Sequence, residues 1–171
     1  AIAQNPPETV ISTTHIFYAG FASLYCQCFT INFKTTIMSK KIFINLPVKD
    51  LQKSMAFYSA MGFTNNPQFS DETAACMVWS EEIYVMLLTY PKFQSFTNKE
   101  ITNTFKTISV IHSFSVESID EVNSMIGKAL NAGGKESNEA KDYGFMLQRS
   151  FEDIDGHNWE VFYMDMSKFA G

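Results

Sequence analysis

The sequence predicts an α+β fold made of two tandem βαβββ modules, and two observations support this prediction. One order of local patterns, a β-prone run, an amphipathic helix and three further β-prone runs, occurs twice along the chain. In addition, Val48-Lys49-Asp50-Leu51 aligns with Val116-Glu117-Ser118-Ile119, as a divergent internal duplication would. Because one such module is too small to bury a sheet face alone, we expect the pair to form a single domain with a cupped mixed sheet around a ligand cavity.

The first module is expected at about residues 41–90. Its opening run, 41–48, is rich in β-branched and aromatic residues and ends next to a proline, as a strand at a sheet edge would. Asp50 stands where a helix N-cap belongs, and Gly62 where the C-cap belongs. Three short β-prone segments follow, at 63–69, 74–79 and 83–90.

The second module is expected at about residues 107–165, after a linker at 91–106. A β-rich run at 107–116 precedes the capping box Ser118-x-x-Glu121, and Gly133-Gly134 ends the predicted helix. The remaining strands are predicted at 135–139, 145–150 and 158–163, with Asp155-Gly156 as the last hairpin turn. The order of elements is therefore the same as in the first module.

Composition restricts the class of protein. Hydrophobic residues make up 46% of the 171 residues and charged residues 18%, which predicts a packed core and excludes a disordered chain. Lys and Arg number 13 against 18 Asp and Glu, for a net charge of -5, so there is no basic field to hold nucleic acid. Three cysteines cannot form a closed disulfide framework, which favours a reducing, cytoplasmic location.

Residues 1–37 are interpreted as an N-terminal extension of a single domain at 38–171. Their only charged residues are Glu8 and Lys34, and no helical or strand period is sustained among them. Their apolar stretch, 16–26, is shorter than the roughly 20 residues that span a bilayer, so no membrane partner is expected. Met38-Ser-Lys-Lys looks like a natural start, so the extension is expected to be non-native or disordered. The alternative is an arm that packs through its aromatic residues on the domain or on a partner.

Two motifs carry a resemblance to a known family. Residues 46–58, Leu-Pro-Val-Lys-Asp-Leu-Gln-Lys-Ser-Met-Ala-Phe-Tyr, are followed by Met61-Gly62-Phe63, and together they resemble the opening of the vicinal oxygen chelate superfamily. Residues 151–163, with Asp155-Gly156-His157 and then Trp159-Glu160, resemble its ending. The superfamily includes glyoxalase I, extradiol dioxygenases, fosfomycin-resistance enzymes and bleomycin-resistance proteins. The resemblance covers about 41–165, and it implies the glyoxalase/bleomycin-resistance fold and a homodimer.

In the enzymes of this superfamily, four side chains, usually His or Glu, hold one divalent metal from the first and fourth strands of each module. Here these positions fall on Phe43, on Leu87 or (with the register shifted by one) Met86, on Ile111 and on Glu160. Only Glu160 can bind a hard divalent ion, so no cofactor is expected. His112 lies one residue from the third position, and a bulge could turn it to the metal face. If any metal is bound, we therefore expect His112 and Glu160 to hold it; otherwise His112 points outward or packs behind the sheet.

Strand alternation from these positions predicts an apolar cavity with a few polar points, which suits an organic ligand. Glu160 is the candidate catalytic acid or base, and the alternative is a carboxylate hydrogen-bonded within the sheet or solvated. Cys76 is interpreted as a structural thiol, since no His/Asp constellation accompanies it. The expected ligand-binding residues are Phe43, Asn45, Leu87, Ser113, Trp159 and Phe162.

Three functions remain open from the sequence. The leading one is a glyoxalase/bleomycin-resistance-like protein that binds a small, partly hydrophobic molecule in a cavity without the superfamily's metal. The second is a metal-dependent lyase or dioxygenase resembling glyoxalase I or an extradiol dioxygenase. The third is an interaction module whose cavity is filled by its own side chains, such as Phe43 and Phe162. Whether the protein is an enzyme stays undecided at this point.

Overall fold

The computed structural model describes residues 40–169, within the unit Met38–Gly171. The predicted extension 1–37 lies outside the described residues. Among the described helices, none has the length and apolar character that crossing a membrane requires.

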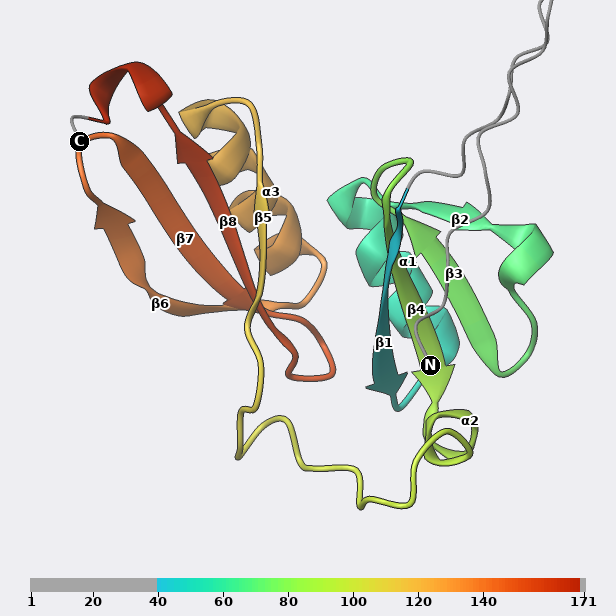
Figure 1. Cartoon of the computed structure of the whole chain (residues 1–171). Coiled ribbons are helices and arrows are strands. Elements are labelled where there is room, and N and C mark those ends of the chain that lie inside the picture. The colour runs from blue at the N-terminus through green and yellow to red at the C-terminus, as the bar shows by residue number, and fades with distance from the viewer. Residues whose placement is uncertain (1–39, 170–171) are drawn as a thin grey trace, which may run out of the picture. The chain divides into compact units, whose positions relative to one another are not determined.

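The first module has the predicted βαβββ order (Figure 1). Its four strands form one sheet in the order β1-β4-β3-β2, in which β1 and β4 are parallel and the other pairs are antiparallel. A short 3-10 helix, Pro67–Phe69, follows β2. The elements are β1 (Ile42–Val48), α1 (Leu51–Met61), β2 (Thr64–Asn66), β3 (Ala74–Val78) and β4 (Ile83–Thr89).

The second module repeats this arrangement, with the strand order β5-β8-β7-β6 and a parallel β5–β8 pair. The predicted α+β fold and its internal duplication are therefore confirmed, although each module has its own four-stranded sheet. A 3-10 helix, Met166–Lys168, ends the described chain. The elements are β5 (His112–Ser115), α3 (Ile119–Asn131), β6 (Lys135–Asp142), β7 (Met146–Glu152) and β8 (Asn158–Met164).

The segment that joins the modules differs from its prediction. The β-rich run at 107–111 is not a strand, because β8 begins only at Asn158 and the first parallel pair is His112 with Trp159. In this register residues 107–110 lie beyond the start of β8 and have no neighbouring strand to bond with. The predicted linker also contains a short helix, α2 (Tyr90–Gln94).

The two main helices begin and end where their capping residues predict. The Asp50 carboxylate accepts a hydrogen bond from the Lys53 backbone N–H (3.2 Å), and Gly62 ends α1 with a φ of 106°. Ser118 Oγ accepts from the Glu121 N–H (3.1 Å), and the Glu121 carboxylate in turn accepts from the Glu117 N–H (2.9 Å). In a capping box the Glu121 carboxylate would accept from the N–H of Ser118 itself. Here it accepts from the N–H of the preceding residue, Glu117, and the rest of the predicted motif is present.

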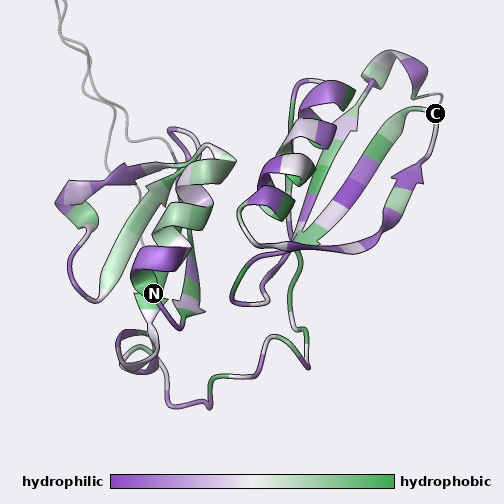
Figure 2. Cartoon of the chain, turned by 180° about the vertical axis from the view of Figure 1, so that it is seen from behind, coloured by the Kyte–Doolittle hydropathy of each residue, from purple (hydrophilic) through white to green (hydrophobic). Residues whose placement is uncertain are grey.

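Each helix covers one face of its own sheet, and the two covered faces share one hydrophobic core. Leu46, Val85 and Leu87 point to the α1 side, and Phe114 and Val161 point to the α3 side. All five belong to a single cluster of buried residues. Figure 2 shows a difference between the sheets: β3 is apolar along its length, whereas β6 is mostly hydrophilic. The face of each sheet away from its helix, called the open face below, is the face on which the superfamily's ligand positions are expected.

Candidate functional site

The two motifs that carry the resemblance bond to each other across the modules. Tyr58, at the end of the first motif, donates a hydrogen bond from its hydroxyl to Asp153 Oδ2 (2.6 Å) and accepts one from Trp159 Nε1 (3.1 Å). The other oxygen of Asp153 accepts from the backbone N–H groups of Asp155 and His157. These residues are buried, so their polar atoms depend on one another for hydrogen bonds.

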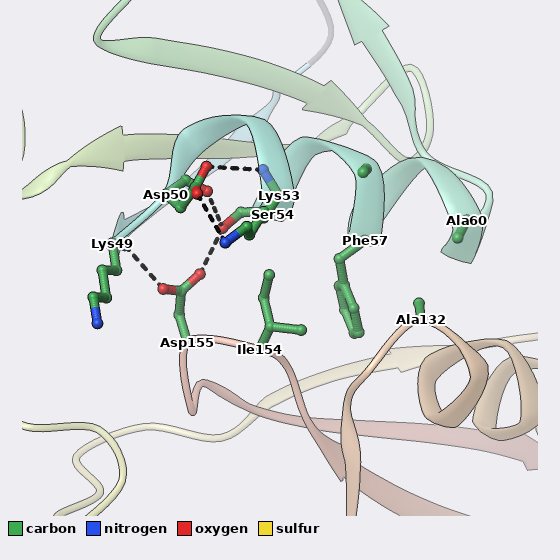
Figure 3. Close-up of a pocket in the computed structure, with 10 residues that line it drawn as sticks. Lys49, Asp50, Lys53, Ser54, Phe57, Ala60, Ala132, Ile154 and Asp155 are labelled. Carbon is green, nitrogen blue, oxygen red and sulfur yellow. Dashed lines mark hydrogen bonds and ion pairs between the residues drawn. The ribbon is translucent and has the colours of Figure 1, made fainter.

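A second set of bonds joins the start of α1 to the turn before β8 (Figure 3). Asp155 Oδ2 accepts from Ser54 Oγ (2.6 Å), and Asp155 Oδ1 accepts from the Lys49 backbone N–H (2.9 Å). The surrounding hollow has a volume of about 680 Å³, and its Asp50, Ser54 and Asp155 side chains are already bonded to the protein. These contacts hold the modules together, so we interpret the polar residues of both motifs as structural.

Burial sets the ionisation of this network. Removal from water raises the pKa of Asp153 above its usual value, although His157 and the Tyr58 hydroxyl act in the opposite direction. Burial, with the negative charge of Asp153 beside it, raises the pKa of Tyr58 well above its usual value. Tyr58 therefore stays protonated and can donate to Asp153.

The open face of the first sheet carries apolar and aromatic side chains at the expected ligand positions. Phe43 pairs with Tyr84 across β1 and β4, and their rings stack with centroids 4.7 Å apart. Asn45 pairs with Met86 on the same face. Phe43 is 52% exposed, so this surface is accessible in the described chain. Of the two alternatives for the second ligand position, Met86 shares the face of Phe43 and Asn45.

The open face of the second sheet carries a polar row that crosses all four strands at one level. Ser113 pairs with Glu160, Glu160 with Ser150, and Ser150 with Asn138. Ser113 Oγ donates to Glu160 Oε2 (2.7 Å), and Asn138 Nδ2 donates to Ser150 Oγ (3.3 Å). Glu160 is only partly buried. Phe162 lies on the same face, one level along β8, opposite Ser115 and Gln148.

Two of the predicted ligand-binding residues lie on the other side of their sheets. Leu87 is fully buried in the core, because it pairs with Leu46 and Ala75 on the side that α1 covers. Trp159 is 3% exposed and faces the core in the same way. The predicted position of Leu87 on the face of Phe43 is wrong, since strand alternation places Met86 there instead. Trp159 lies between Asn158 and Glu160 on β8, and its role in ligand binding stays a prediction. Phe43, Asn45, Ser113 and Phe162 do lie on open faces.

His112 and Glu160 point to opposite faces of the second sheet. His112 pairs with Trp159 and its ring stacks on the indole, with centroids 4.7 Å apart, whereas Glu160 pairs with Ser113. No bulge interrupts the register between β5 and β8. Burial, with a smaller effect of His157, lowers the pKa of His112. His112 thus packs behind the open face and does not join Glu160 there.

These side chains do not fit the superfamily's metal. Between residues 40 and 169, no group of three or more His, Cys, Asp or Glu side chains is placed to hold a metal ion. Phe43, Met86 and Ile111 offer no oxygen or imidazole ligand, and one carboxylate does not make a chelating site. We therefore derive no chemistry through a metal.

Two cavities lie where the modules meet, and His112 contributes to both. One has a volume of about 570 Å³ and lies under the joining segment, with Asn45, Thr104 and His157 among its walls. His157 Nε2 is 2.9 Å from the Pro47 carbonyl oxygen, so that ring is already engaged. The other has a volume of about 410 Å³ and is mostly aromatic and aliphatic. Sequence reasoning missed both, because the lining residues of each cavity come from separate segments of the chain and no local pattern relates them.

The structural role of the motifs could have been found in the sequence. Ser54, Tyr58 and Asp155 are all polar positions of the two motifs, and polar residues within an apolar pattern require partners when they are buried. Which residues would be those partners could not be read from the spacing, since Ser54 and Asp155 are far apart in the chain.

Comparison with known proteins agrees with this geometry. A family model described as bleomycin resistance protein-like N-terminal matches residues 40–80. A solved structure of a hypothetical protein from S. aureus is 26% identical and covers 74% of this chain and 94% of its own, with a TM-score of 0.63. A glyoxalase-related enzyme from Fulvimarina pelagi is 20% identical over 74% of this chain and 88% of its own, with a TM-score of 0.63.

A genomically encoded fosfomycin resistance protein from Listeria monocytogenes is 18% identical over 74% of this chain and 93% of its own, with a TM-score of 0.54. No curated protein sequence matches the chain. The family model covers the first of the two motifs, and the solved structures share the fold that the resemblance implies. The chain has the fold of the glyoxalase/bleomycin-resistance proteins.

Proposed function

We propose that the protein binds a small, partly hydrophobic organic molecule on its open faces and does so without a metal ion. The observation that carries this proposal is the set of side chains at the superfamily's ligand positions. Phe43 and Met86 present an aromatic ring and a thioether on the open face of the first sheet, Ile111 before β5 is aliphatic, and only Glu160 presents a carboxylate. Such a set favours burial of an apolar ligand and disfavours chelation.

Each open face supplies a different part of the recognition. The stacked rings of Phe43 and Tyr84 offer an exposed flat surface on which an apolar or aromatic group can pack. Glu160 and Ser113 offer a hydrogen-bonded carboxylate and hydroxyl that can accept from an amine, amide or hydroxyl of the ligand. The ligand class is therefore an organic molecule with an apolar part and a hydrogen-bond donor.

Pairing of modules between two copies would not change the number of carboxylates at the four ligand positions. A homodimer, which the resemblance implies, would bring together open faces with the same side chains, so the four ligand positions would still contain one carboxylate. No observation favours the alternative of a metal-dependent lyase or dioxygenase. The homodimer and the cytoplasmic location are parts of the proposal, and light scattering after size-exclusion chromatography tests the first.

The metal part of the proposal is tested by elemental analysis. The full chain is incubated with Zn²⁺, Ni²⁺, Mn²⁺ or Fe²⁺, desalted and measured. We expect less than about a tenth of an equivalent of each metal, because one carboxylate binds divalent ions weakly. A stoichiometric metal that is lost in Glu160→Gln would overturn the proposal and would make glyoxalase-like and dioxygenase-like assays the next step.

The ligand part is tested by a thermal-shift screen of small aromatic amines, amides and alcohols. We expect compounds that raise the melting temperature of the wild-type protein and raise it less in Glu160→Gln, since the variant loses a charged acceptor. Glu72→Gln, in the exposed turn before β3, is the matched control. Shifts that are equal in wild type and Glu160→Gln would show that the carboxylate does not hold the ligand.

A further inference from the structure

We propose a second small-molecule site, on the helix-covered side of the sheets, that takes an uncharged aromatic molecule with one hydroxyl group. The site is the cavity of about 410 Å³ between the two modules, called the aromatic cleft below. Its volume lies within the range of ligand pockets. The aromatic cleft is lined by Ile42, Ile44, Phe63, Trp79, Ile83, Ile111, His112, Ser113, Phe114 and Trp159.

The walls of the aromatic cleft are apolar and are held in place by the core. Trp79 of the first module lies against Phe114 of the second, with ring centroids 5.0 Å apart, and against Phe63, at 4.9 Å. Phe63, Phe114 and Trp159 are buried members of the shared core. Ile42 and Ile111 are about half exposed and form part of the rim. The aromatic rings are thus positioned by packing before any ligand arrives, which lowers the entropic cost of binding.

One hydrogen-bonding group in the aromatic cleft has no partner. The Nε2 atom of His112 is buried and makes no hydrogen bond with the described residues. The other polar side chain, Ser113, is bonded to Glu160. A buried polar atom without a partner costs free energy. A ligand that bonds to Nε2 removes this cost, so the hydrogen bond contributes more to the binding free energy than it would in water.

The lack of charged side chains in the lining of the aromatic cleft favours an uncharged ligand. This lining contains no Asp, Glu, Lys or Arg. His112 is neutral near pH 7, because burial and the neighbouring His157 lower its pKa. An ionised ligand would lose its hydration there without gaining a counter-ion. The single free nitrogen and the aromatic walls therefore fit a phenol or a similar alcohol, whose hydroxyl donates to Nε2 in the tautomer that leaves this nitrogen unprotonated.

The site does not rest on the function proposed for the open faces. Trp159 and His112 point to the side of the sheet opposite Glu160, and Ser113, which bonds to Glu160, is the one lining residue that the two sites share. Substitutions in one site can therefore serve as controls for the other.

The test uses 4-propylphenol as the probe and the full chain as the protein. Trp79 and Trp159 are the only tryptophans of the chain, and both line the aromatic cleft, so their emission reports on occupancy. Excitation at the red edge of the indole band avoids the phenol, and calorimetry gives an independent dissociation constant. We expect saturable binding, and weaker binding of 4-propylanisole, the methyl ether that cannot donate.

His112→Phe keeps an aromatic ring against Trp159 and removes the nitrogen. We expect it to weaken 4-propylphenol about five- to tenfold, the usual worth of one hydrogen bond, and to leave 4-propylanisole nearly unchanged. Glu160→Gln should change neither. Ile42→Trp, at the exposed rim, should block the aromatic cleft with little effect on the melting temperature and abolish binding in calorimetry.

Three results would overturn the proposal. Absence of saturable binding at all protein concentrations would mean that the aromatic cleft is closed, by a second copy or by another part of the chain. Equal binding by wild type and His112→Phe would mean that Nε2 is satisfied by water. Binding lost in Glu160→Gln but not in His112→Phe would place the probe on the open face and would support the proposed function alone.

Discussion

Replacing Tyr58 by Phe should destabilise the protein far more than the same change at an exposed tyrosine. Tyr58 is 1% exposed, and its hydroxyl donates to Asp153 at 2.6 Å and accepts from Trp159 Nε1 at 3.1 Å. The substitution removes a hydrogen bond to a charged group and leaves a buried indole N–H without a partner. Each loss is worth about 1.5–3 kcal/mol, and because the two share one hydroxyl we expect a total of about 3 kcal/mol.

Tyr84→Phe is the matched control. The Tyr84 hydroxyl accepts from Lys41 Nζ (2.8 Å) and donates to the Glu81 carbonyl (3.0 Å), both at the surface. Its loss should cost less than about 0.5 kcal/mol. In urea, with a slope near 2 kcal/mol per molar, Tyr58→Phe should lower the unfolding midpoint by about 1.5 M. Midpoints within about 0.2 M of each other for the two variants would refute the inter-module network as a source of stability.

The effect of Tyr58→Phe should also depend on pH. The hydroxyl stabilises the ionised form of Asp153, so its removal raises a pKa that burial has already raised. The variant therefore gains more stability than wild type when acid protonates Asp153. The difference between the two proteins should be largest near neutral pH and should shrink as the pH falls, and a difference that grows in acid would contradict the assignment.

Three further predictions concern the rest of the fold. Gly127→Ala should stabilise the protein by about 0.5–1 kcal/mol, because Gly127 lies inside α3 and a Cβ there meets no atom within 4 Å. Gly134→Ala should destabilise the protein by about 2 kcal/mol, since the added Cβ would lie 2.7 Å from the Glu152 carbonyl oxygen. Urea unfolding measures the stability of both variants, and a stability change opposite in sign to the one expected would contradict the packing. The pKa of His112 is lower in the folded protein than in the unfolded chain. The stability that the neutral ring provides is therefore complete above the unfolded-state pKa, and it is lost as the pH falls through the pKa of the folded protein. Melting temperatures from about pH 7.5 to 5.5 should therefore fall less in His112→Phe than in wild type, and parallel curves would show that His112 titrates normally.

The sequence alone predicts the order of elements, because that order depends on local chemistry. The apolar period of α1 and α3, the caps at Asp50 and Ser118 and the turn at Gly62 act within a few residues, and the structure places all of them as expected. The limits of β5 were not predictable in the same way. Residues 107–110 have β propensity, but a strand also needs a neighbour, and β8 does not extend to meet them.

The candidate site was predicted only in part. Strand alternation placed four residues correctly on open faces: Phe43, Asn45, Ser113 and Phe162. The face of a side chain follows from its position within its own strand, so no information on other strands is required. Alternation failed for Leu87, where β4 was counted one residue out of register, since a shift of one residue moves a side chain to the other face. The same rule separates His112 from Glu160.

The sequence by itself determined the duplication, the fold and the side chains available at the superfamily's ligand positions, because these follow from local propensity and motif spacing. Only the tertiary structure decided which partners the polar residues of the motifs bond to. Asp153 and Asp155 hold Tyr58 and Ser54 across the modules, and Trp79 and Trp159 meet around His112. These contacts join residues far apart in the chain, and their geometry is set by the packing of two sheets, which no pattern along one strand or helix contains.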